Sequence, residues 1–452
     1  MRALSLPTWK SPAGCRNALL LGHGELAGAA CWLQAKQGTL SVPGTSEAST
    51  VPETDRKIFT DWRWAALLHG LVVVVLTVVV WQSSVHLPPA QEFAPQHRPI
   101  SFQYGEGVLR PWAYWDGGFY ARIAEDGYPA EDRLVFARGG ETLVAFLPGY
   151  PLLAGGVARL GMGTGLGLLM TTLAAGFGAT IALHGWFTTK MSLPSARWAS
   201  LTVAAFPWAY FLVAAAYGEA LFLLLAVAAF LCAERDRPVA AGLLAAAASL
   251  TRLVGIGVVL GVALRVAERR GALTFVGWRP CLDLSKFRRR DTGLLVGISG
   301  LGGWMLYCWI RYGDPLAFST AQRGWNGGIG LNSLLKLNLL DQLQNNTDRG
   351  FVARLVAQGV VMIAFALALP AVWRRFGAGY GTYALVVVAL SLLGSGNFAS
   401  HGRFALMIFP VFGLVGERLA SERTLPARAV LVVSGVALVL VTSLWGRGHW
   451  MA

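Results

Sequence analysis

The chain has 452 residues, of which 55% are hydrophobic and 14% are charged, and its mean hydropathy is +0.52. A soluble protein cannot bury so much apolar surface, so the composition indicates a multi-pass membrane protein. The formal net charge is +14, but basic residues crowd residues 265–291, between apolar stretches. That distribution is typical of a cytoplasmic loop and argues against a nucleic-acid-binding protein.

The first 60 residues differ from the rest of the chain, because they are rich in Gly, Ser, Thr and Pro. Residues 1–60 contain no apolar run long enough to cross a bilayer, and we expect a disordered cytoplasmic tail. Residues 61–452 are expected to form one membrane domain. Basic residues precede its first predicted span, Trp64 to Trp81, so residues 82–142 are predicted to be the first extracytoplasmic loop.

Within that loop, residues 112–128 read WAYWDGGFYARIAEDGY and gather acids, aromatic residues and glycines. Asp116 is the best candidate for a catalytic carboxylate. The same pattern is typical of a short amphipathic helix with Asp116 as N-cap and Gly127 as C-cap. The two interpretations are compatible, since a capping carboxylate can also act as a base.

The next apolar segment, residues 146–160, is short and contains Pro148 and Pro151. If it crossed the membrane, Lys190 and Arg197 would lie outside, which the positive-inside rule disfavours. We therefore expect a re-entrant or interfacial element that lines a cavity in the protein.

The later apolar segments are expected to alternate across the membrane. Residues 198–216 and 219–233 are predicted to form a hairpin. Residues 238–264 must return the chain to the cytoplasmic side, so we expect two short helices that meet near Thr251 and Arg252 at the outer face. Further spans are predicted near residues 292–310, 351–372, 380–397, 404–420 and 429–446, with outer loops at 311–350 and 398–403.

The five cysteines and seven histidines form no recognisable ligand pattern. No two cysteines have the C-x-x-C spacing, and no two histidines lie three or four residues apart on a predicted span. We predict that the protein holds no metal and no other cofactor.

Four separated features reach the outer face on this topology: Asp116, the turn from Tyr217 to Glu219, Arg252, and the segment His401 to Arg403. Arg252 interrupts an apolar stretch, and a charge in that position is a functional hypothesis by default. Because such a charge is costly, we expect Arg252→Leu to leave the melting temperature unchanged or to raise it. Simpler explanations exist for Glu219, which can stabilise a helix N-terminus, and for Arg403, which can snorkel to the membrane surface.

Residues 112–128 and the following FLPGYPLL resemble the first extracytoplasmic loop of the PIG-V type mannosyltransferases, membrane enzymes of the GT-C class that are similar to GPI mannosyltransferases. Shorter segments match the family in the same order: AAYGEALF at 215–222, ASLTRLVGIG at 248–257 and GRFALMIFPVF at 402–412. The sequence departs from the family at Ala220, where Ser is usual, and at Phe404, where Tyr is usual. We give position 220 no binding role, because alanine lacks the hydroxyl.

The resemblance implies an all-α polytopic GT-C glycosyltransferase with about 10–12 transmembrane helices, a bacterial homologue in the plasma membrane. Its implied reaction is inverting transfer of mannose from polyprenyl-phosphate-mannose to a glycolipid or glycan acceptor on the extracytoplasmic face. Asp116 is the expected general base, and arginines would hold the donor phosphate. The expected substrate-binding residues are Trp115, Tyr120, Tyr217, Glu219, Arg252 and Arg403.

Two other classes of protein fit the same residues. A transporter or flippase of a lipid-linked sugar would grip the phosphate with the same arginines but would need no base. An inactive membrane scaffold would need neither. The aromatic residues near Asp116 also have a commoner explanation as an interfacial belt. No internal repeat, from which many transporters are built, is visible by eye.

Overall fold

The computed structural model describes residues 61–87, 109–130, 142–276, 279–325, 330–421 and 425–451. All of them belong to one compact unit, Val51–Ala452. The predicted tail, residues 1–60, lies outside the described residues, as do two parts of the predicted first loop, residues 88–108 and 131–141.

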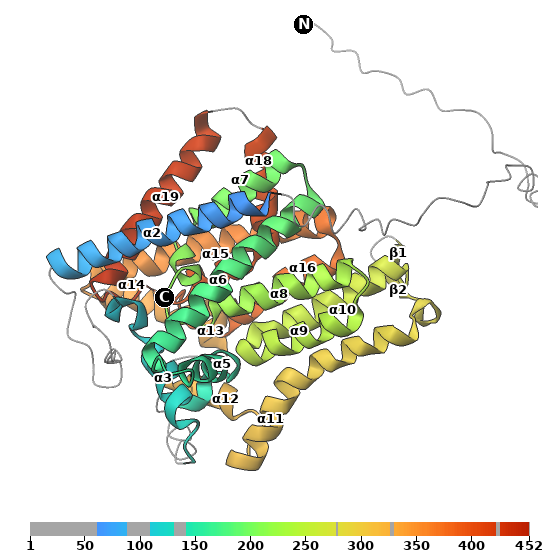
Figure 1. Cartoon of the computed structure of the whole chain (residues 1–452), viewed down its shortest axis with the longest axis horizontal. Helices are drawn as coiled ribbons and strands as arrows, with labels where there is room; N and C mark the ends of the chain where they lie inside the picture. The colour runs from blue at the N-terminus through green and yellow to red at the C-terminus, as the bar shows by residue number, and fades with distance from the viewer. Residues whose placement is uncertain are drawn as a thin grey trace, which may run out of the picture. The chain divides into compact units, whose positions relative to one another are not determined.

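Nearly all the described residues are helical, as predicted (Figure 1). The α-helices are α2 (Trp62–His86), α3 (Asp116–Asp126), α5 (Gly149–Ala158), α6 (Thr164–Lys190), α7 (Leu193–Ala204), α8 (Glu219–Glu234), α9 (Pro238–Thr251), α10 (Ile256–Arg270), α11 (Ser299–Tyr312), α12 (Ala317–Thr320), α13 (Leu331–Leu335), α14 (Leu337–Asn345), α15 (Arg349–Phe376), α16 (Ala378–Leu393), α17 (His401–Met407), α18 (Phe409–Ser421) and α19 (Leu425–Gly446). Short 3-10 helices connect them: η2 (Arg110–Ala113), η3 (Leu143–Ala145), η4 (Ala209–Leu212), η5 (Leu253–Gly255), η6 (Leu284–Lys286), η7 (Arg289–Ile298) and η8 (Ala321–Trp325).

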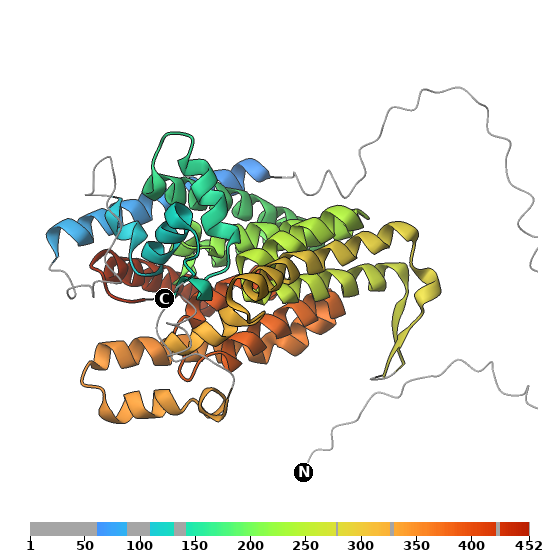
Figure 2. The same cartoon turned by 90° about the horizontal axis from the view of Figure 1, so that it is seen from below.

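One β-hairpin departs from the all-α prediction. Strands β1 (Leu273–Val276) and β2 (Arg279–Leu282) pair antiparallel and lie within the predicted cytoplasmic loop, residues 265–291. That loop is also shorter than predicted, because α10 continues to Arg270. Figure 2 shows the hairpin running across the ends of the neighbouring helices rather than along them.

Several helices have the length and composition of membrane spans. Among the described residues, five segments qualify, and a sixth if α17 and α18, bent by 73° at their junction, count as one span. The five are Trp62–His86, Thr164–Lys190, Arg289–Tyr312, Arg349–Phe376 and Arg428–Gly446. Helices α9 and α16 are apolar but shorter. The chain is a multi-pass membrane protein, and among its described residues fewer helices than the predicted 10–12 are long and apolar enough to span a bilayer.

The first half of the predicted hairpin, residues 198–216, is wrong as a continuous span. Helix α7 ends at Ala204, three residues before Pro207, and the chain continues through η4 to Gly218. Proline lacks a backbone donor and restricts the residue before it, which accounts for the early end. Helix α7 packs mainly against α18, whereas α8 packs against α6 and α9.

The predicted break between residues 238 and 264 is confirmed. Helix α9 ends at Thr251, Arg252 is extended with φ −149° and ψ 145°, and η5 and α10 follow. The turn brings Gly255 against α9, where a Cβ atom on Gly255 would lie 2.4 Å from Ser249 Cα. Only glycine permits that approach.

The structure also tests the predictions for two other segments, 146–160 and 404–420. The segment 146–160 contains α5, which has 10 residues and therefore measures about 15 Å. That length agrees with an element that does not cross the bilayer. The predicted span 404–420 is wrong as one straight helix, because the chain bends between α17 and α18, next to Pro410.

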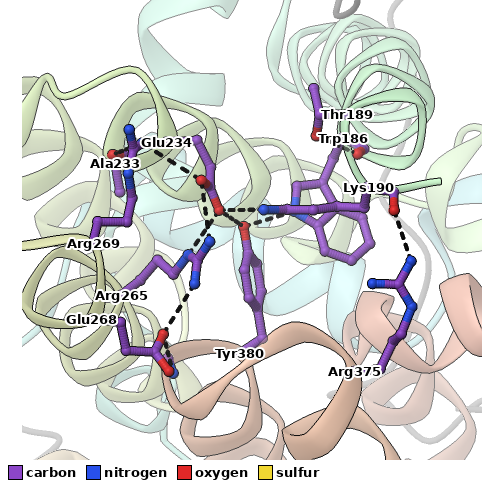
Figure 3. Close-up of polar contacts among 11 residues, drawn as sticks. Trp186, Thr189, Lys190, Ala233, Glu234, Arg265, Glu268, Arg269, Arg375 and Tyr380 are labelled. Atoms are coloured by element: carbon purple, nitrogen blue, oxygen red, sulfur yellow. Dashed lines mark hydrogen bonds and ion pairs between the residues drawn. The ribbon is translucent and has the colours of Figure 1, made fainter. Parts of the chain in front are cut away.

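Glu234, the last residue of α8, is the centre of a polar cluster that joins several helices (Figure 3). Its carboxylate accepts hydrogen bonds from Lys190 of α6, from Arg265 Nε of α10 at 2.8 Å and from Tyr380 Oη of α16 at 2.9 Å. Helix α8 begins at Glu219, so it carries an acid at each end, about 22 Å apart. The cluster fixes the four helices at the end away from Glu219.

The predicted topology can be tested with single cysteines and a thiol reagent that does not cross membranes. We expect Arg323→Cys, in the predicted outer loop, to react in intact cells, and Cys281, on the β-hairpin, to react only after permeabilisation. Both side chains are exposed, so protection reports the membrane rather than packing. Labelling of Arg197→Cys in intact cells would contradict the re-entrant assignment of residues 146–160.

Candidate functional site

Asp116 is the first residue of α3, not its N-cap. The N-cap position is held by Trp115, whose positive φ of 62° is one that bulky residues rarely adopt and whose own side chain makes no capping hydrogen bond. The Asp116 carboxylate instead accepts a hydrogen bond from Arg403 Nη1 at 2.9 Å. The predicted capping role of Asp116 is therefore wrong. The predicted C-cap is confirmed, since the Gly127 N–H donates to the Ile123 carbonyl.

Tyr217 fixes the start of α3 against the segment before α8. Its hydroxyl accepts a hydrogen bond from the Asp116 backbone N–H at 3.0 Å and donates to the Tyr114 carbonyl at 3.4 Å. A further hydrogen bond, 2.8 Å long, runs from the Ala216 N–H to the Trp112 carbonyl. Tyr217 itself is fully buried. The position of the Asp116 carboxylate is thus set by contacts from a distant part of the chain.

Glu219 lies between two arginines. It is the first residue of α8 and is completely buried. Its Oε1 forms a hydrogen-bonded ion pair with Arg252 and lies 3.5 Å from Arg403 Nη1. A helix-dipole role alone does not account for this arrangement, because the carboxylate also lies between two cations.

Arg252 occupies the extended break between α9 and η5 and turns its guanidinium toward Glu219. The expectation that Arg252→Leu leaves the melting temperature unchanged assumed a charge without a partner. The ion pair reverses that expectation, because removal of one partner leaves the other charge buried.

Arg403 is the residue that joins the two acids. Its side chain is 11% exposed, and it contacts Asp116, Glu219 and the Ser400 hydroxyl, the last at 3.0 Å. The guanidinium also lies over the Tyr217 ring, 5.3 Å from its centre. A snorkelling arginine would extend to the membrane surface, whereas Arg403 is held inside the protein.

Gly402 allows α17 to approach closely enough to place Arg403. A Cβ atom at Gly402 would lie 2.1 Å from the Trp208 ring, and the Gly402 N–H donates to Gln358 Oε1 at 3.0 Å. The neighbouring His401, which the sequence grouped with Arg403, directs its Nδ1 to the Ala399 carbonyl, 2.9 Å away. Its ring packs against other aromatic rings rather than joining the ion pairs described above.

Phe404 is a site residue that the sequence analysis missed. The guanidinium carbons of Arg252 and Arg403 lie 5.6 Å and 5.7 Å from the centre of its ring. Two cation–π contacts to one ring hold the two arginines on either side of Glu219. The sequence places this aromatic residue next to Arg403, but Phe404 was interpreted there only as a departure from the family pattern.

The aromatic residues near Asp116 pack inward. The Tyr120 ring is 5% exposed and meets the rings of Phe146, Tyr150 and Tyr217 at 5.2, 5.0 and 6.1 Å. Trp115 is 9% exposed and belongs to the hydrophobic core. These side chains are buried and packed against other aromatic rings or in the hydrophobic core. Their stacking on a sugar stays a prediction.

The four charged side chains of the site, Asp116, Glu219, Arg252 and Arg403, are two acids and two bases, so their formal charges cancel. Burial places them in a medium where charges interact more strongly than in water. Among the described residues, no group of three His, Cys, Asp or Glu side chains is placed to hold a metal ion. Each acid of the site is paired with an arginine. In a metal site, by contrast, several carboxylates would converge on the ion. Metal-free chemistry at this site stays a prediction.

No family model matches the sequence, and no curated protein matches it. The chain is similar to ArnT from Cupriavidus metallidurans, crystallised with undecaprenyl phosphate, with 17% identity and a TM-score of 0.44 over 80% of this chain and 62% of that one. It is also similar to the oligosaccharyltransferase of Archaeoglobus fulgidus, crystallised with a tethered acceptor peptide, with 12% identity and a TM-score of 0.38 over 88% of this chain and 56% of that one. The chain thus spans less than two thirds of the length of either structure.

Proposed function

We propose that the chain is a GT-C glycosyltransferase that uses a polyprenyl-phosphate sugar as donor and acts on the extracytoplasmic face. The observation that carries the proposal is the contact of Asp116 with the buried ion pairs of Glu219, Arg252 and Arg403. These residues come from four segments that are far apart in the sequence. Sugar transfer from a lipid phosphate requires a base for the acceptor hydroxyl and cations that bind the phosphate, and a carboxylate near two arginines can supply both.

The proposed reaction is a single displacement. The acceptor hydroxyl oxygen attacks the anomeric carbon as its proton passes to Asp116, and the bond from that carbon to the phosphate oxygen breaks. The electron pair of this bond leaves with the phosphate, whose added charge Arg252 and Arg403 stabilise. One displacement inverts the configuration of the anomeric carbon.

Mannose is proposed as the sugar because residues 112–128 resemble the PIG-V type mannosyltransferases. The donor is then polyprenyl-phosphate-mannose, and the acceptor is a glycolipid or glycan at the outer face of a bacterial plasma membrane. The direct test is an assay of purified, lipid-reconstituted protein with that donor and candidate acceptors, beside the glucose and arabinose donors. Transfer from a different donor would refute the mannose assignment. Movement of the lipid-linked sugar across the membrane without sugar transfer would refute the proposal of a glycosyltransferase and support a flippase.

We expect the activity to survive chelation. The leaving group carries one phosphate, and two arginines supply the positive charge that a divalent metal would otherwise provide. Turnover should be unchanged in EDTA and should not rise when Mn²⁺ or Mg²⁺ is added. Loss of turnover in EDTA that either metal restores would make Asp116 a metal ligand rather than a base.

A further inference from the structure

The β1–β2 hairpin lies far from Asp116, at the other end of α10, a helix of 15 residues and about 22 Å. Its register defines two faces. Leu273 pairs with Leu282 and Phe275 with Pro280, so these four residues share one face. Thr274 pairs with Cys281 on the opposite face, where Arg279 also lies. The hairpin therefore has one wholly apolar face and one mixed face, on which Val276 pairs with Arg279.

The apolar face is open. The exposed fractions of Phe275 and Leu282 are 45% and 58%, and that of Leu284, just after the hairpin, is 70%. Large apolar side chains that cluster on an uncovered surface indicate a contact with an apolar partner. In a membrane protein, the nearest such partner is the bilayer itself.

Basic residues lie in the hairpin and directly after it in the chain. Residues 271–291 contain five basic and two acidic residues, a formal charge of +3. Asp236 and Asp291 bind Arg270, Arg288 and Arg290. Exposed basic side chains therefore remain beside an exposed apolar face, a combination that binds to membranes containing anionic lipids.

The direction of the hairpin agrees with such a contact. The hairpin lies in the chain between α10 and the segment formed by η7 and α11. Its strands cross the ends of these helices (Figure 2). Since η7 and α11 together form a segment of membrane-spanning length, the start of η7 lies near the membrane surface. A hairpin that crosses the helix ends there lies along that surface rather than through it.

We propose that the hairpin is an interfacial anchor that binds the anionic phospholipid headgroups of the surrounding bilayer. Phe275 and Leu282 enter the boundary between headgroups and acyl chains, and Arg289, which follows the hairpin in the chain, contacts lipid phosphates. The proposal is independent of the glycosyltransferase assignment, because no residue of the Asp116 site takes part.

Two neighbouring residues on opposite faces provide the first test. One full-length variant keeps Cys281 and has its other four cysteines replaced by Ser; a second carries Leu282→Cys in a cysteine-free background. Both are labelled with an environment-sensitive fluorophore and reconstituted into nanodiscs. We expect blue-shifted emission and protection from iodide at position 282 but not at position 281. Equal quenching of both, or protection at 281 alone, would overturn the proposal.

Lipid composition and charge provide the second test. The shift at position 282 should be larger in nanodiscs with phosphatidylglycerol than in phosphatidylcholine alone, and Arg289→Gln should lose that difference. Arg279→Gln, on the opposite face of the hairpin, should retain it. A second control, Arg323→Gln, removes an exposed charge beyond the other end of α11 and should also retain the difference. A shift that is independent of lipid composition and of Arg289 would overturn recognition of anionic headgroups. These readouts do not depend on activity.

Discussion

Asp116→Asn should reduce sugar transfer by two to four orders of magnitude, the usual contribution of a general base. Asparagine keeps the shape of the side chain and can still accept a hydrogen bond from Arg403, but it cannot take the acceptor proton. The fold should survive with a lower melting temperature, because Glu219 is then shared between Arg252 and Arg403 and one positive charge of the site is left without an acid. Turnover with saturating donor and acceptor measures the first effect, and the melting temperature measures the second.

Asp126→Asn is the matched control. Asp126 is the last residue of the same helix and is exposed, so its replacement removes an equal charge without touching the site. Its turnover should equal that of the unmodified protein. Donor binding by Asp116→Asn should also be retained, since the arginines remain. Full turnover in Asp116→Asn would remove the base from the mechanism and favour the flippase.

Glu219→Leu should cost the protein about 3–5 kcal/mol of stability, because it leaves the Arg252 cation buried without its acid. Arg252→Leu should cost less, since Glu219 still faces Arg403. The double variant should be more stable than Glu219→Leu, because the remaining Asp116–Arg403 pair is balanced and two leucines suit an apolar interior. Thermal unfolding of the four proteins in one detergent forms a double-mutant cycle.

Measuring sugar transfer by the same four proteins distinguishes a structural role of the Glu219–Arg252 pair from a functional one. The double variant should recover stability but not transfer, since the proposed phosphate contact is lost. Arg375→Leu is the control for an exposed ion pair; Arg375 binds Glu417 near the protein surface, and its loss should cost no more than about 1 kcal/mol. A double variant that melts lower than both single variants, or that keeps full activity, would contradict the assignment.

The sequence was sufficient to predict the helical class and the position of the Arg252 break. Both follow from local information: apolar runs need about 20 residues to cross a bilayer, and one continuous span could not return residues 238–264 to the side of the basic loop. The sequence also singled out Asp116, Glu219, Arg252 and Arg403, and the structure places all four in contact.

The contacts themselves could not be predicted. Asp116 and Arg403 are separated by 287 residues, and nothing local indicates that Asp116 faces an arginine rather than the end of its own helix. The pairing of Glu219 with Arg252 depends on how α8 packs against α9. The end of α7 was missed because the apolar run continues past Pro207, and hydropathy alone does not register a missing backbone donor.

The ion pair between Asp116 and Arg403 couples two steps of the proposed reaction. In the resting protein, each arginine is already engaged by a carboxylate, so a donor phosphate competes with these acids for the same guanidinium groups. When Asp116 takes the acceptor proton it becomes neutral, and its attraction for Arg403 falls at the moment when the departing phosphate gains charge. Loss of that proton to solvent restores the carboxylate, which then competes with the spent lipid phosphate for Arg403 and favours its release. One hydrogen-bonded pair thus links the protonation state of Asp116 to the strength with which Arg403 holds phosphate, from donor capture to product dissociation.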